Sequence, residues 1–185
     1  MMRRIALTAT LALTALPAAA TGNLIVCGPA AIVSFAEGAP VDRIRIENHS
    51  RGPWVIDTLT VTLAGSAGQL VFDTVRGGAG VNVAQQFRVL SGGEMVLSRP
   101  AIGDGDESLT LMFEGFASGS RAVFGIDLDD RVTGYGGTSV SGGEIAGATV
   151  TVRFADPATG ADQTETFEGR FESDGIAIAA APCLS

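Results

Sequence analysis

Hydrophobic and polar residues alternate with a period of two along most of this chain. Within residues 58–63, leucine and valine fall on one face of an extended segment and threonine falls on the other, a pattern typical of a half-buried antiparallel strand. The same alternation recurs in five further segments, which are residues 42–48, 108–115, 121–128, 148–154 and 164–171. No segment after residue 20 shows the 3.6-residue period of a long helix, so the pattern predicts an all-β protein.

Glycine-rich turns separate the alternating segments. Glycine readily supplies the positive φ angles that tight connections need. Strands of five to ten residues joined by such turns predict an antiparallel β-sandwich, either jelly-roll or immunoglobulin-like, with roughly nine to eleven strands. The segment 156–162 begins with Asp-Pro and contains a glycine, so it predicts a hairpin that pairs residues 147–155 with residues 163–171.

The first twenty residues have the pattern of an export signal. Two arginines precede an apolar run that is too short to cross a bilayer, and a proline and three alanines follow it. We therefore expect residues 1–20 to be a signal peptide and residues 21–185 to form a single β-sandwich domain. The mature protein is then exported to the periplasm or the extracellular space, and no later stretch is apolar enough for a transmembrane segment.

The charge of the chain argues against one class of partner, and its two cysteines predict a disulfide. The chain has 20 acidic residues against 12 basic ones and a net charge of −8. This balance disfavours nucleic acid as a partner, because phosphate binding relies on lysine and arginine. The two cysteines, Cys27 and Cys183, lie near opposite ends of the mature chain, and an isolated pair in an exported protein predicts one disulfide.

Three acids near the end of the 121–130 segment are the strongest candidates for a site. Alternation places Phe124, Ile126 and Leu128 in the core, so Asp127 and Asp129 project together from the opposite face, with Asp130 just beyond. Carboxylates this close repel one another unless water, an arginine or a cation screens them, and calcium is the natural cation for oxygen ligands. Two interpretations stay open: a calcium site formed by Asp127, Asp129 and Asp130, or a solvated strand end.

Other candidate residues favour ordinary structural roles. A second acidic cluster at residues 104–107 has the Asp-x-Asp spacing of part of a calcium loop but lacks the twelve-residue EF-hand pattern, and a solvated turn explains it equally well. His49 is the only histidine, which excludes a histidine-rich zinc site, and no GxSxG motif is present for a serine nucleophile. Trp54 is expected to anchor the start of a strand. No cofactor other than calcium is indicated.

Four segments carry a resemblance to a known family: residues 70–74, 78–89, 104–130 and 142–154. Together they resemble short exported proteins of alphaproteobacteria that are themselves similar to the core protein of the sponge aggregation factor. The resemblance implies a secreted β-sandwich that acts in adhesion or aggregation at the cell surface or in a matrix, without enzymatic activity, and with an extracellular protein or polysaccharide as partner. The alternatives are a carbohydrate-active enzyme using a carboxylate pair, and a structural surface subunit.

Overall fold

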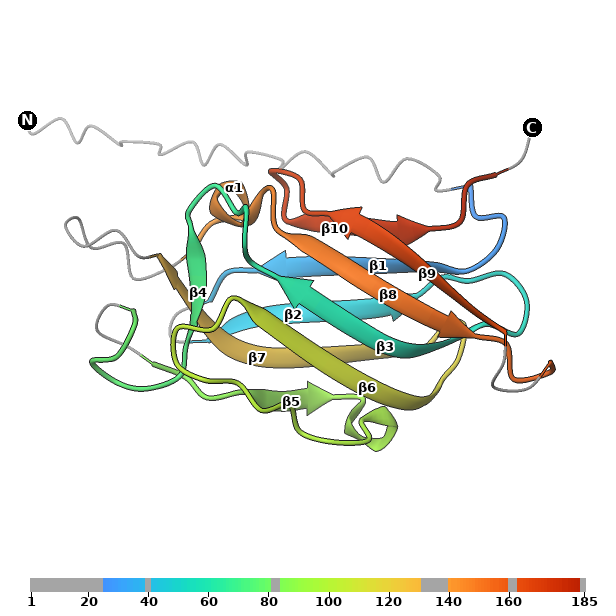
Figure 1. Cartoon of the computed structure of the whole chain (residues 1–185), viewed down its shortest axis with the longest axis horizontal. Helices are drawn as coiled ribbons and strands as arrows, with labels where there is room; N and C mark the ends of the chain where they lie inside the picture. The colour runs from blue at the N-terminus through green and yellow to red at the C-terminus, as the bar shows by residue number, and fades with distance from the viewer. Residues whose placement is uncertain (1–24, 39–40, 81–83, 131–139, 160–162, 184–185) are drawn as a thin grey trace, which may run out of the picture.

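A computed structural model of the chain describes residues 25–38, 41–80, 84–130, 140–159 and 163–183. In these ranges ten β-strands form two antiparallel sheets that pack face to face, which confirms the predicted β-sandwich (Figure 1). The signal peptide predicted for residues 1–20 lies outside the described residues.

Six strands form the larger sheet. Their bounds are β1 Ala30–Ala36, β2 Asp42–Asn48, β4 Leu70–Asp73, β5 Arg88–Ser91, β7 Arg121–Asp130 and β10 Ile176–Ala180. The order is β10-β1-β2-β7, and both β4 and β5 pair with the remaining edge of β7. The later residues of β7 pair with β4 and the earlier ones with β5, so the chain leaves this edge after β4 and returns to it at β5.

Four strands form the smaller sheet, in the order β6-β3-β8-β9. Their bounds are β3 Val55–Thr62, β6 Ser108–Phe116, β8 Thr149–Ala155 and β9 Thr164–Arg170. The pairing of β8 with β9 confirms the hairpin that the sequence predicts. The described helices are short, η1 Gly93–Met95 and α1 Gly142–Ile145, and a capping box between Ser141 and Glu144 closes the first turn of α1.

The core lies between the two sheets and follows the predicted alternation. On β7, Phe124, Ile126 and Leu128 are all buried, as expected, and on β3 Leu59 and Val61 are fully buried. Trp54 packs against this core while remaining partly exposed, which agrees with its expected place at the start of a strand. The inward positions of both sheets therefore form one continuous apolar layer.

Phe124 joins the two sheets through aromatic contacts. Its ring centroid lies 6.2 Å from that of Phe113 on β6 and 5.3 Å from that of Phe87, and Phe124 is fully buried. We expect Phe124→Ala to lower the free energy of unfolding by about 3–5 kcal/mol, because a large cavity would remain in a close-packed interior. Urea denaturation measures the change, with the exposed Met112→Ala as control. A loss below about 1 kcal/mol would show that Phe124 is not a core residue.

Candidate functional site

The acids that the sequence singles out lie at the end of β7. Asp127 and Asp129 share the outer face of the larger sheet, as predicted, since Leu128 between them points into the core. The alternation of the strand assigns Asp130 to the other face, so it does not join the pair. Asp127 is only 9% exposed, so the idea of a solvated strand end does not describe it.

A third carboxylate, which the sequence analysis missed, lies directly beside Asp127. Asp73 ends β4 and is the cross-strand partner of Asp127, so both side chains leave the same face of the sheet. Asp73 is 1% exposed, and its Oδ1 atom is buried without any hydrogen-bond partner. The site therefore contains at least two buried carboxylates from neighbouring strands.

A loop covers these carboxylates. The amide of Gln85 donates to the carbonyl of Asp73 and the amide of Asp127 donates to the carbonyl of Gln85, both at 3.2 Å, so the chain leaves the sheet after Asp73 and returns beside it. Within the loop, Gly80 approaches so closely that a Cβ there would clash with the carboxylates of Asp73 and Asp129. A side chain at this position would displace the two carboxylates, so glycine allows the loop to pack directly on them.

Asp104 holds the start of this loop. Its Oδ1 accepts hydrogen bonds from the amides of Thr74 at 2.9 Å and Val75 at 3.0 Å, and its Oδ2 accepts one from the amide of Ala79 at 2.7 Å. These amides, that of Thr74 first, lower the pKa of the Asp104 carboxyl below its usual value. Asp104 therefore fixes the start of the loop through hydrogen bonds and is not simply part of the solvated turn that the sequence also allowed.

Asp42 adds a further buried carboxylate on the neighbouring strand β2. It is 2% exposed and accepts hydrogen bonds from the amides of Gly38 at 3.1 Å and Leu128 at 3.0 Å. The bond from Leu128 gives a partner to a β7 amide that lies just beyond the residues paired with β2. Asp42 therefore has a structural role and brings another negative charge close to Asp127.

Burial and mutual repulsion raise the pKa of three carboxyls in this cluster. Burial, followed by the charges of Asp42 and Asp73, raises the pKa of Asp127 from the usual 3.8 to about 7. Burial is also the largest cause for Asp73 and for Asp42, and the pKa of each rises to about 6. No arginine is among the groups that shift these three values, so within the described ranges no cationic side chain compensates them.

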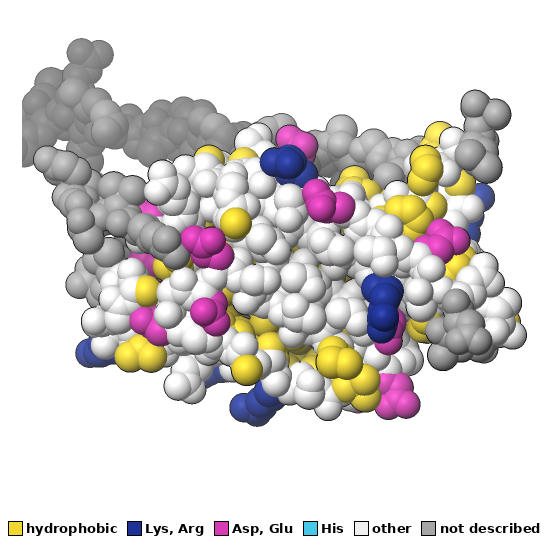
Figure 2. All heavy atoms as spheres, in the orientation of Figure 1, with side chains coloured by type: hydrophobic (Ala, Val, Ile, Leu, Met, Phe, Trp, Pro, Cys, Tyr) yellow, Lys and Arg dark blue, Asp and Glu magenta, His cyan; other side chains and the backbone are white. Residues whose placement is uncertain are grey.

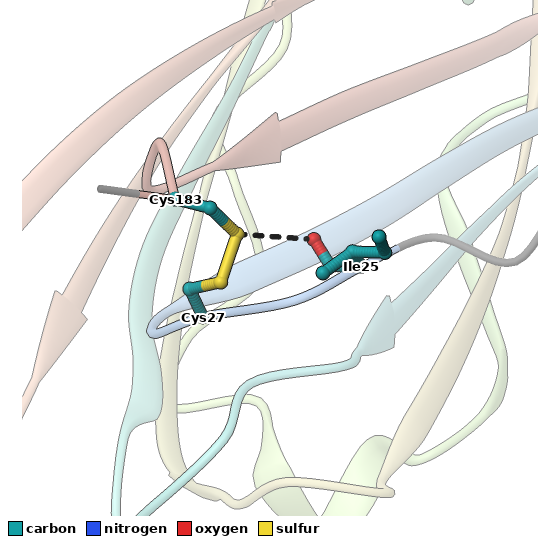
Figure 3. The surroundings of a disulfide bond; sticks show 3 residues. All are labelled: Ile25, Cys27 and Cys183. Carbon is teal, nitrogen blue, oxygen red and sulfur yellow. Dashed lines mark hydrogen bonds between the residues drawn. A yellow bond between two sulfur atoms is a disulfide. The ribbon is translucent and has the colours of Figure 1, made fainter. Parts of the chain in front are cut away.

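The predicted disulfide between Cys27 and Cys183 is present, with a Cα–Cα distance of 5.3 Å (Figure 3). The two cysteines flank β1 and β10, which pair from Ala30 and Ala180 onward, so the bond lies just beyond the end of that pair. His49 lies 3.7 Å from Glu47 and is largely exposed, and its amide donates to the carbonyl of Ala30 at the start of β1. It lines a surface pocket with Ser118 and Ser120, and the Ser118 hydroxyl there donates to the carbonyl of Ser50.

A second surface stands out on the smaller sheet. Many of its outward positions carry hydroxyl side chains, which we call the threonine face: Thr58, Thr60, Thr62, Ser108, Thr110, Thr149, Thr151 and Thr166. Two rows of hydroxyls cross β6, β3 and β8, with Glu168 and Arg170 at the β9 positions of these rows, and Met112 and Arg153 flank Thr58 in the next row. The hydroxyls of Thr60 and Thr110 lie 3.0 Å apart and are hydrogen-bonded. Figure 2 views the molecule from this side and shows that the middle of the face carries few charged or hydrophobic side chains.

Neither metal-site geometry nor a membrane helix is evident in the described ranges. No three His, Cys, Asp or Glu side chains in those ranges already stand in the arrangement of a metal centre. The helices described there are not long and apolar enough to cross a bilayer.

Comparisons with protein-family models, with curated protein sequences and with solved structures found no match to this chain.

Proposed function

We propose that this protein is an exported, non-enzymatic β-sandwich that mediates adhesion at the cell surface or in an extracellular matrix, and that the threonine face is its binding surface. The observation that carries the proposal is the alignment of uncharged hydroxyl side chains in two rows across β6, β3 and β8. The Cys27–Cys183 disulfide, the export signal expected at residues 1–20 and the family resemblance support it.

The chemistry of this face favours a neutral polysaccharide as the partner. Most of the chain's ionisable groups are acidic, so a charged polymer would meet repulsion or a large desolvation cost over much of the surface. Threonine hydroxyls both donate and accept hydrogen bonds, as sugar hydroxyls do, and their methyl groups provide apolar contact. The two hydroxyl rows across β6, β3 and β8 can contact a polymer without burying a charge.

Substitution of two central threonines tests this proposal. We expect beads coated with the protein to be retained on a neutral matrix polysaccharide, and Thr60→Arg combined with Thr151→Arg to reduce retention at least about tenfold, because two long charged side chains would block the face. The measurement is bead retention under flow, with the melting temperature of each variant recorded in parallel.

Thr159→Arg is the matched control, since it makes the same chemical change on the exposed turn before β9. Retention that survives in the double variant, or that falls equally in the control, would contradict a role for the threonine face.

The alternatives of a carbohydrate-active enzyme and of a structural subunit stay predictions from the sequence. No feature of the acid cluster favours the enzyme, because the loop covers Asp73 and Asp127.

A further inference from the structure

The buried Oδ1 atom of Asp73 calls for an explanation. A buried polar atom without a hydrogen bond is costly, and nearly all such atoms in folded proteins have a partner or an ion. Asp73 is 1% exposed, so bulk water does not solvate this oxygen. The neighbouring acids supply no donor while they are ionised, because a carboxylate only accepts hydrogen bonds.

Three aspartates leave the same face of the larger sheet near this position. Asp127 stands opposite Asp73 across the β4–β7 pair, and Asp129 follows two residues later on the same face. The Oδ2 atoms of Asp73 and Asp129 both lie within 2.7 Å of the point that a Cβ of Gly80 would occupy. Two of the three carboxylates therefore already face each other beneath the loop.

Among the described residues, no hydrogen bond or ion pair holds the Asp127 carboxylate elsewhere. Its pKa is shifted by burial and by the charges of Asp42, Asp73 and Asp129, and no hydrogen bond contributes. The ion pairs described for this chain are His49–Glu47 and Arg153–Asp57, so none of them includes Asp73 or Asp127. The Asp127 side chain can thus turn towards Asp73 without breaking a contact.

We propose that a calcium ion binds between Asp73, Asp127 and Asp129 and holds residues 74–80 against the larger sheet. The donors are all oxygens, which selects a hard cation, and an irregular loop can add backbone carbonyls and water to reach the six to eight ligands that calcium takes. The rigid octahedral geometry and short bonds that magnesium demands suit a pair of strands and a loop less well.

The ion supplies what the described side chains lack. It compensates two buried charges that have no cationic partner, and it gives the Asp73 Oδ1 atom a ligand in place of a hydrogen bond. Because the three carboxylates do not yet stand in metal-site geometry, we expect them to close around the ion when it binds. The inference is independent of the proposed adhesion function, since the threonine face lies on the other sheet.

Calcium titration of the purified protein at about pH 7.5, after treatment with a chelator, tests the site. We expect calorimetry to report one ion per chain with a Kd on the order of 10⁻⁴ M, as in other extracellular calcium modules. At about 10 mM calcium chloride the melting temperature should rise by roughly 5 °C, because the ion binds the folded chain only. Magnesium chloride at the same concentration should give a clearly smaller rise.

Three variants assign the ligands. Asp73→Asn, Asp127→Asn and Asp129→Asn should each weaken calcium binding at least about tenfold. Asp127→Asn is the most informative of these, because it removes a buried charge that accepts no hydrogen bond and so should fold. Glu168→Gln on the exposed strand β9 is the control for the loss of one charge and should bind calcium like the wild-type chain.

Several results would overturn the proposal. A melting temperature and a calorimetric signal that do not respond to calcium would exclude the ion. Calcium binding that persists unchanged in Asp127→Asn and Asp129→Asn would place it elsewhere in the chain. An effect of magnesium as large as that of calcium would rule out the assignment to calcium.

Discussion

Raising the pH from about 4.5 to about 8 without divalent cations should lower the free energy of unfolding by on the order of 3–5 kcal/mol. Asp42, Asp73 and Asp127 each have a higher pKa in the folded chain than the usual 3.8, at about 6, 6 and 7. Between those limits the folded chain binds more protons than the unfolded chain. The stabilising contribution is therefore complete below about pH 4 and is lost as the pH rises to about 7.

The size of this change in the free energy of unfolding follows from the three pKa shifts, and it is smaller than their sum because the carboxyls interact. One pKa unit corresponds to about 1.4 kcal/mol, but the charges of Asp42 and Asp73 themselves raise the pKa of Asp127, so the separate shifts do not add. The contribution of Asp104 has the opposite sign, because its pKa is lowered, and it changes only below about pH 4. It therefore does not affect the pH range of the measurement.

Urea denaturation at a series of pH values, in the presence of a chelator, measures the dependence. Asp127→Asn should make the chain more stable than the wild type at about pH 8 and should flatten the curve between pH 5 and about 7, because the amide never ionises. Glu168→Gln should leave the curve unchanged. Stability that rises with pH across this range would contradict the picture of uncompensated buried carboxyls.

The alternating pattern was enough to predict the sandwich and the inward residues of the strands it covers. Phe124, Ile126 and Leu128 are buried because a strand can place only every second residue in the core, whatever its partner. The same rule correctly placed Asp127 and Asp129 on the outer face. What the period could not show is what covers that face, since a loop distant in sequence packs on the carboxylates of Asp73 and Asp129 and bonds to the amide of Asp127.

Asp73 escaped the sequence analysis for a related reason. It ends a four-residue strand in which every residue is buried, so its segment has no alternation to read. Its importance comes from the register that sets it opposite Asp127, and pairing between distant strands leaves no local signal. One hint was present in the sequence: the apolar residues 70–72 end in an acid, and glycines follow a few residues later.

The threonine face, too, could be predicted only in part from the sequence. Alternating threonines in β3 and β8 are visible in the sequence, and each strand alone predicts an outward hydroxyl row. Their alignment into one surface depends on the pairing of Thr60 with Thr110 on one side and Thr151 on the other. A single sequence contains the rows but not the order of the strands.

Removal of the disulfide should have the second large effect. We expect Cys27→Ala combined with Cys183→Ala to lower the free energy of unfolding by about 5 kcal/mol, because the bond closes a loop with a sequence separation of 156 residues. Without the bond, the unfolded chain gains the conformational freedom that this closure removes. A loss of this size is comparable to the whole stability of many domains, so the variant should unfold at much lower urea concentration.

The position of the disulfide determines what should happen first as the variant is destabilised. β10 is an edge strand of the larger sheet, and the bond lies at the end of its pairing with β1. Hydrogen exchange should therefore quicken first in β10, at the amides that bond to β1, before it quickens in β7 at the centre of the sheet. Wild-type protein treated with a reductant should behave like the double variant, whereas the double variant should not respond to reductant. Equal stability of the oxidised wild type and the variant would show that the two sheets hold the chain ends without the bond.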